Sequence, residues 1–134
     1  MPLNATSEAR LKGVHPDLAK VIQRLAKDSK TDFIVTEGLR TLARQKQLVA
    51  AGASKTMRSR HLTGHAVDLA VTVNGDIRWD WPLYLRLAAL MKSNALRLGV
   101  KMVAGADWAT FKDGPHYELD WGTYPPAEGN IHAA

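Results

Sequence analysis

The chain has 134 residues, 46% of them hydrophobic, which is enough apolar material for one domain with its own core. It has no cysteine, so disulfide scaffolds and thiolate metal sites are excluded, and any metal must be held by histidine and carboxylate. The 18 Lys and Arg against 13 Asp and Glu give a net charge of +5. This scattered excess fits a polyanionic partner, such as nucleic acid or the cell envelope, or simply a solvated surface.

The first ten residues show no charged start followed by an apolar stretch, so no secretory signal is expected. No segment approaches the roughly 20 apolar residues that cross a bilayer. We therefore expect synthesis in the cytoplasm, no stable membrane insertion, and another factor that gives access to any substrate beyond the membrane. No repeat or linker divides the chain, which predicts one domain over 1–134, with a core over about 15–121 and an irregular tail over 122–134.

In chain order, hydrophobic periodicity and capping residues predict helices over 16–28, 42–51 and 82–98. A strong two-residue turn signal, Asn74 followed by Gly75, predicts a hairpin. The expected strands are 32–36, 66–73, 77–79, 100–103 and 116–121. This mixture predicts an α+β fold, a small and mostly antiparallel sheet with helices packed on it.

The strand over 66–73 has the clearest pattern in the sequence. Val67, Leu69, Val71 and Val73 alternate onto one face, which leaves Asp68 on the other face between two alanines. A carboxylate on a strand whose other face is core is costly unless it is paired or bound to a cation. The small neighbours leave room beside Asp68 for a coordinated group.

Two histidines complete a candidate metal site with Asp68. His61 ends a polar, basic loop, and His116 begins the last predicted strand after a Gly-Pro turn that follows Asp113. Zinc held by three protein ligands keeps a fourth position open for water, which is typical of catalytic sites. Zinc lowers the pKa of that water toward about 7, and Asp113 is placed to take its proton and pass it to a leaving amine.

The segment Ser59-x-His61-x-x-Gly64-x-Ala66-x-Asp68 matches, at every fixed position, a motif of the VanY-like zinc peptidases. The chain is therefore similar to a family that includes D-alanyl-D-alanine carboxypeptidases and dipeptidases. The same family includes the L-alanyl-D-glutamate peptidases that some tailed phages use as endolysins.

A second motif of this family, an acid three positions before the third zinc ligand, resembles Asp113-x-x-His116. Many members have Glu at the acidic position, so Asp is a modest departure. The resemblance runs from about residue 15 to about residue 121. It implies that His61, Asp68 and His116 bind Zn²⁺, and that Asp113 acts as general base and then as general acid.

The resemblance also implies an arginine that polarises the scissile carbonyl, and Arg40 is the candidate, three residues after Glu37. The alternative for Arg40 is a structural salt bridge with Glu37. Asp107 is the next candidate for the base, and Glu118 shares the strand face of His116. His65 stands at a variable motif position and is expected to be exposed.

The resemblance implies hydrolysis of the peptidoglycan stem peptide. The short chain, the absence of a signal and the basic charge resemble single-domain phage endolysins for Gram-negative hosts, which favours the L-alanyl-D-glutamate bond. Such a protein waits in the host cytoplasm until a holin opens the membrane. It then cuts the periplasmic cell wall and so lyses the cell. We expect it to be a monomer. Alternatives are a D-alanyl-D-alanine carboxypeptidase or dipeptidase, and a catalytically silent cell-wall-binding module. A nucleic-acid-binding domain is disfavoured because no basic stripe or recognition helix is visible.

Overall fold

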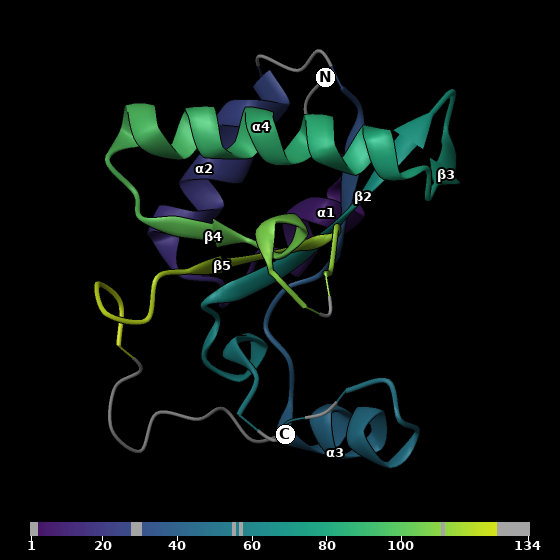
Figure 1. Ribbon diagram of the computed structural model, residues 1–134, viewed down its shortest axis with the longest axis vertical. Coiled ribbons are helices and arrows are strands. Elements are labelled where there is room, and N and C mark those ends of the chain that lie inside the picture. The colour runs from purple at the N-terminus through teal and green to yellow at the C-terminus, as the bar shows by residue number, and fades with distance from the viewer. Residues whose placement is uncertain (1–2, 28–30, 55, 57, 111, 126–134) are drawn as a thin grey trace.

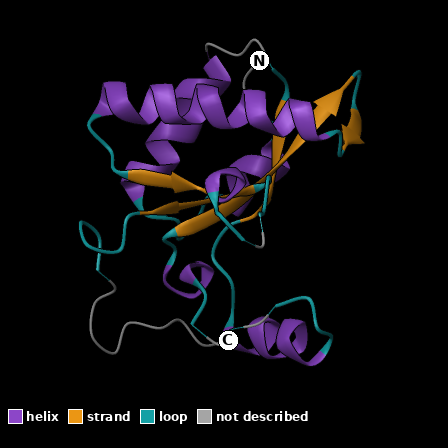
Figure 2. Ribbon diagram, in the orientation of Figure 1, coloured by secondary structure: helices purple, strands orange, loops and turns teal. Residues whose placement is uncertain are grey.

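A five-stranded sheet forms the centre of the computed structural model, which describes residues 3–27, 31–54, 56, 58–110 and 112–125. The strand order is β1-β2-β5-β4, with β3 paired to β2, and every pairing is antiparallel. The strands are β1 (Phe33–Glu37), β2 (Ala66–Val73), β3 (Asp76–Arg78), β4 (Met102–Ala104) and β5 (His116–Leu119). The predicted α+β architecture is confirmed (Figure 2).

Helices α2 (Pro16–Lys27) and α4 (Trp81–Leu98) cover one side of the sheet, and α1 (Ala5–Arg10) packs beside β1 (Figure 1). Helix α3 (Leu42–Ala50) lies on the opposite side from α4, beyond the short 3-10 turn η1 (Arg60–Thr63). A second 3-10 turn, η2 (Gly105–Asp107), follows β4. No helix in the described ranges has both the length and the apolar character needed to span a bilayer.

The hydrophobic core lies between the sheet and the helices α2 and α4. From β2 it takes Val67, Leu69 and Val71, all buried, as the alternating pattern predicts. Val73 does not join them, although the pattern places it on the same face. It is 38% exposed, because the end of β2 enters the hairpin with β3, which projects beyond the helices (Figure 1).

The packed body begins before residue 15, which the predicted core boundary left out. Helix α1 has only six residues, too few for a readable periodicity, yet Asn4 caps it and its side chains reach β1. Ser7 Oγ accepts a hydrogen bond from the Val35 N–H at 3.0 Å, and Arg10 Nη1 donates to the Val35 carbonyl at 3.0 Å. At the other end, Tyr124 packs against the body, so the ordered fold also continues past residue 121.

Several helices and strands begin or end at other residues than predicted, for local reasons. The Val100 N–H donates to the Ala95 carbonyl and closes α4, so β4 begins at Met102 rather than at residue 100. Strand β5 ends at Leu119, because the next residues form a turn. The predicted loop over 53–60 runs into η1, where Arg60 is buried rather than solvated. Part of the predicted tail, 126–134, lies outside the described residues.

Gly64, the fixed glycine of the first motif, is needed for two reasons. Its φ is +75°, and a Cβ there would lie 2.2 Å from the Gly13 carbonyl oxygen. Gly52 is a matched control, because its φ is +76° and a Cβ there would meet nothing within 4 Å. We expect Gly52→Ala to lower the free energy of unfolding by about 1–2 kcal/mol through backbone strain alone. Gly64→Ala should lose roughly 1–3 kcal/mol more through the clash.

Urea unfolding of the two variants and the wild type measures this difference. Equal losses in the two variants would show that the approach to Gly13 does not constrain the motif.

Candidate metal centre and active site

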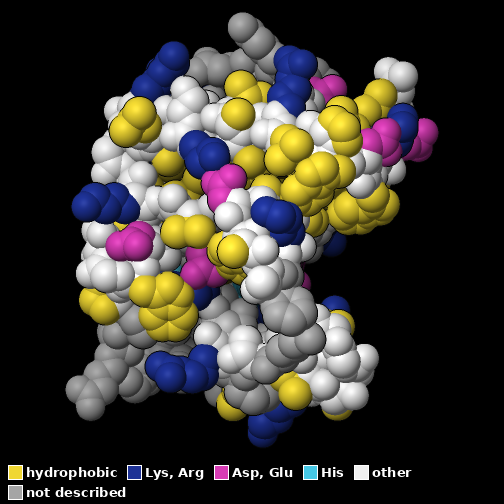
Figure 3. Space-filling model, in the orientation of Figure 1, with side chains coloured by type: hydrophobic (Ala, Val, Ile, Leu, Met, Phe, Trp, Pro, Cys, Tyr) yellow, Lys and Arg dark blue, Asp and Glu magenta, His cyan; other side chains and the backbone are white. Residues whose placement is uncertain are grey.

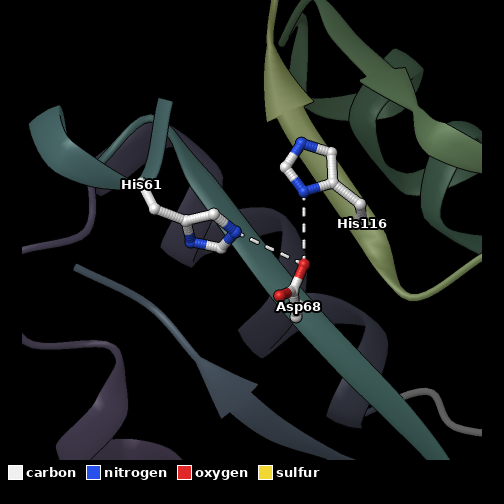
Figure 4. A group of neighbouring side chains, drawn as sticks. All are labelled: His61, Asp68 and His116. Carbon is white, nitrogen blue, oxygen red and sulfur yellow. Dashed lines mark hydrogen bonds and ion pairs between the residues drawn. The ribbon is translucent and has the colours of Figure 1, made fainter. Parts of the chain in front are cut away.

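The pairing of β2 with β5 brings two predicted ligands together. Asp68 lies directly opposite His116 in the antiparallel register, so both side chains stand on the same face of the sheet, away from the core. His61 approaches from η1 just before β2 (Figure 4). One ligand atom from each of the three residues lies within 4.8 Å of the others. The structure thus brings together the three residues that the motif predicts to be ligands.

His61 is held so that one ring nitrogen has no partner. Ser59 caps η1 by accepting a hydrogen bond from the His61 N–H. His61 Nδ1 lies 2.8 Å from the Gly38 carbonyl oxygen, which requires the proton on Nδ1 and leaves a lone pair on Nε2. Nε2 is buried, lacks a hydrogen-bond partner in the described part of the chain, and lies 3.4 Å from Asp68 Oδ1.

His116 is bound through both ring nitrogens. Nδ1 lies 3.2 Å from Asp68 Oδ1, and Nε2 lies 2.8 Å from Glu118 Oε1. Burial alone would lower the pKa of His116, but the hydrogen bonds to Asp68 and Glu118 raise it to about 9. Burial likewise opposes ionisation of Asp68, but the hydrogen bond with His116 holds its pKa well below the usual range. The site therefore favours an ionised carboxylate and attracts positive charge.

These atoms suit a metal ion. A buried nitrogen lone pair without a donor is costly, and a cation placed between the three side chains would satisfy it. Two imidazole nitrogens and a carboxylate oxygen are ligands that divalent transition metals accept, and no thiolate competes. The group formed by His61, Asp68 and His116 can hold a metal ion.

Asp113 lies in the same cleft and belongs to a tightly held turn. Its N–H donates to the Gly105 carbonyl, and its own carbonyl accepts from the His116 N–H, both at 3.1 Å. Burial and the nearby charge of Asp68 raise the pKa of its carboxyl. The rival acid Asp107 instead pairs with a surface lysine at 2.8 Å and does not line the cleft.

Arg40 makes the predicted salt bridge with Glu37. It also faces His61, Asp68 and His116, which we call the metal group because they could hold a metal ion. Its Nε and Nη2 each donate to the Glu37 carboxylate at 2.7 Å, and Nη1 donates to Gln45 Oε1 at 2.8 Å. Ser59 Oγ lies 3.4 Å from the same Nη1, which can use its second hydrogen there. Of five N–H groups, one on Nη2 is then left, and Nη2 lies 3.9 Å from Asp68 Oδ2. The two interpretations of Arg40 are therefore compatible.

A cleft of about 1040 Å³ contains the metal group, Asp113 and Arg40. Leu48 and Ser54, from α3 and the segment after it, line the cleft across from the sheet. Figure 3 shows the molecule hollowed between the main body and this part of the chain. Trp108 stands in the wall with its ring centroid 5.2 Å from that of His116. An extended peptide can enter such an open cleft.

Two features of the site escaped prediction from sequence. The Gly38 carbonyl that orients His61 is a backbone atom, which no residue pattern signals. The expectation that His65 is exposed is wrong, because the residue is only 8% exposed. Its Nδ1 lies 2.6 Å from Thr63 Oγ1, and its ring packs against that of His15, which is distant in sequence.

The phage L-alanyl-D-glutamate peptidase family matches residues 1–126. The L-alanyl-D-glutamate peptidase of Escherichia phage T5 is 37% identical over 122 residues, 88% of this chain and 88% of that protein. The peptidoglycan L-alanyl-D-glutamate endopeptidase CwlK of Bacillus subtilis is 28% identical over 120 residues, 75% of this chain and 68% of that protein. The crystal structure of the Serratia marcescens L-Ala D-Glu endopeptidase ChiX superposes with a TM-score of 0.88 at 45% identity, over 93% and 94% of the two chains.

These matches, together with the cleft and its metal group, make the chain a peptidase. It belongs to the phage L-alanyl-D-glutamate peptidase family. The resemblance expected from the two motifs is thereby confirmed. The alternatives of a catalytically silent module and a nucleic-acid-binding domain are set aside.

Arg40 should be important for stability as well as for the site. Arg40→Ala leaves the Glu37 carboxylate and the buried Gln45 amide without their charged partner, so we expect a loss of roughly 2–4 kcal/mol. Arg44→Ala, at an exposed position in α3, is the control and should change stability by less than about 0.5 kcal/mol. Chemical unfolding of both variants measures the difference. An Arg40→Ala protein as stable as the control would contradict a structural part for this residue.

Proposed function

We propose that the chain is a zinc-dependent peptidoglycan peptidase that hydrolyses the L-alanyl-D-glutamate bond of the stem peptide. The supporting observation is the buried, unpartnered Nε2 of His61, which faces Asp68 and His116 in an open cleft. The relatives described above are named for this bond, which favours it over the D-alanyl-D-alanine bond. Zinc is the preferred ion, because two histidines and one carboxylate are a ligand set of catalytic zinc.

His61, Asp68 and His116 would hold the zinc ion. When bound, zinc acts as a Lewis acid and lowers the pKa of water toward about 7. The Asp113 carboxylate accepts a proton from the attacking water and delivers it to the amine of the leaving D-glutamate. Its raised pKa suits this shuttle, because a carboxyl that ionises too readily would not return the proton.

Arg40 supplies the remaining charge. Its salt bridge with Glu37 fixes the guanidinium plane, and the uncommitted hydrogen of Nη2 is available to the scissile carbonyl oxygen. A preorganised cation at that position stabilises the negative charge that develops on the oxygen during attack. The salt bridge thus orients the residue rather than competing with its catalytic use.

The cellular role that fits this activity is lysis of a host cell by a phage endolysin. The substrate would be the periplasmic cell wall, reached from the host cytoplasm once a holin opens the membrane. The basic charge of +5 supports binding to an anionic cell envelope. Relatives from Bacillus and Serratia show that bacteria carry homologues too. Because cleavage of the bond is common to phage and bacterial relatives, lysis of whole cells is the property that tests the endolysin role.

The first test is turbidity loss of outer-membrane-permeabilised Gram-negative cells. We expect lysis by the wild type to stop with a chelator and return with zinc. Asp113→Asn should reduce the rate by about 10²–10⁴-fold because it removes the general base, while zinc binding remains. Asp107→Asn is the matched control and should lyse like the wild type, because Asp107 points to the surface.

Lysis that persists in chelator would refute the zinc mechanism. Analysis of digested, purified cell wall identifies the bond, since new amino groups on D-glutamate support the proposal. Released D-alanine would support the carboxypeptidase instead.

Zinc binding should release a proton from His116. Its pKa of about 9 means that the ring is protonated at pH 7 in the metal-free protein, and only the neutral ring can bind zinc. The apparent zinc affinity should therefore rise by about tenfold per pH unit from pH 7 to pH 9 and then level off. Calorimetry in buffers of different ionisation enthalpy counts the protons released. An affinity that is constant over this range would contradict a protonated His116.

A further inference from the structure

Among the described acids that line the cleft, Glu118 is the one with no part in the reaction given so far, and this inference rests on the proposed zinc site. It stands two residues after His116 on the same face of β5, opposite Ala66 of β2. Its side chain is 13% exposed, and Oε1 lies 2.8 Å from His116 Nε2. The small side chain of Ala66 leaves room for this contact.

Both carboxylate oxygens of Glu118 are engaged. Oε1 binds His116, and Oε2 accepts a hydrogen bond from the Trp121 Nε1–H at 3.0 Å. Glu118 does not belong to the group that could hold a metal ion, because Oε1 binds Nε2 of His116 and not the nitrogen beside Asp68. Glu118 is therefore neither a ligand nor a base in this arrangement.

Trp121 is in turn held in place by Arg60, in η1. Its ring lies over the buried Arg60 guanidinium, with Cζ 4.2 Å from the ring centroid. Arg60 Nη2 also donates to the Leu119 carbonyl at 3.0 Å and to the Tyr124 carbonyl at 2.7 Å. Arg60 immediately precedes His61, so the cluster of Glu118, Trp121 and Arg60 joins the two chain segments that carry the histidines. The segment after β5 thus belongs to the site.

We propose that Glu118 is a positioning residue that keeps the proton of His116 on Nε2 and so presents Nδ1 to the metal. Trp121 orients Glu118 for this purpose. The geometry matches this assignment, because Nδ1 is the nitrogen that lies beside Asp68, at 3.2 Å. A carboxylate bound to the far nitrogen of a ligating histidine fixes the ring orientation and raises its basicity.

The test measures zinc binding rather than activity alone. The zinc dissociation constant is obtained by competition with a chromophoric chelator, and visible absorption of the Co²⁺-substituted protein reports ligand geometry. Glu118→Ala should bind zinc about 10–100-fold more weakly and show an altered Co²⁺ spectrum. Glu118→Gln should stay within about threefold of the wild type, because its amide oxygen still accepts from Nε2. Asp107→Ala removes an equal charge at the surface and should bind zinc like the wild type.

Trp121→Phe keeps an aromatic ring over Arg60 but removes the N–H donor, so zinc binding should weaken by about threefold to tenfold. If Glu118→Ala does not fold, Glu118→Met replaces it, since methionine fills the space without an accepting oxygen. Wild-type zinc affinity in Glu118→Ala or Glu118→Met would overturn the inference, as would equal losses in Glu118→Gln. A wild type that binds no zinc would instead refute the proposed function itself.

Discussion

The antiparallel register between β2 and β5 is the constraint on which the rest of the site depends. It places Asp68 opposite His116, while Val67 and Leu69 on the other face of β2 are buried in the core. A shift by one residue would send Asp68 into the core and the apolar side chains into the cleft. The hydrophobic core therefore keeps the metal group in register.

The arrangement of charge follows from this constraint. The ionised Asp68 accepts a hydrogen bond from His116, lies beside His61 and is near the Arg40 guanidinium, which is itself paired with Glu37. The same negative charge, together with burial, discourages ionisation of Asp113. The two carboxyl groups of the cleft thus have pKa values shifted in opposite directions. The lowered pKa of Asp68 suits binding of a cation, and the raised pKa of Asp113 suits transfer of a proton. This division of roles is common where two acids share an active site.

The sequence was most informative where local spacing determines which way a side chain points. Strand alternation put Asp68 on the face opposite the core, and the Gly-Pro turn put Asp113 beside His116, as the structure has them. Helix α1 was missed because it is short and owes its position to contacts with β1.

Contacts between distant segments could not be predicted in the same way. His65 was expected to be exposed because it stands at a variable motif position and strand alternation points it away from Asp68, whereas the ring of His15, 50 positions away, packs against it. Arg60 donates to the carbonyl of Leu119, at the end of β5, and to that of Tyr124, which are 59 and 64 positions away in the chain. The sequence pattern suggested only a solvated basic residue.

The far wall of the cleft is attached mainly by polar contacts. In α3 the one buried residue is the polar Gln45, which is fully enclosed. Its side-chain amide binds Ser54 Oγ at 2.9 Å and the Thr56 carbonyl, and its oxygen accepts from Arg40. Arg40 therefore connects this wall to the metal group, because it binds Gln45 and lies 3.9 Å from Asp68 Oδ2. The position of this wall therefore depends on the hydrogen bonds of Arg40 and Gln45, whereas Asp68 and His116 are held by the pairing of β2 with β5.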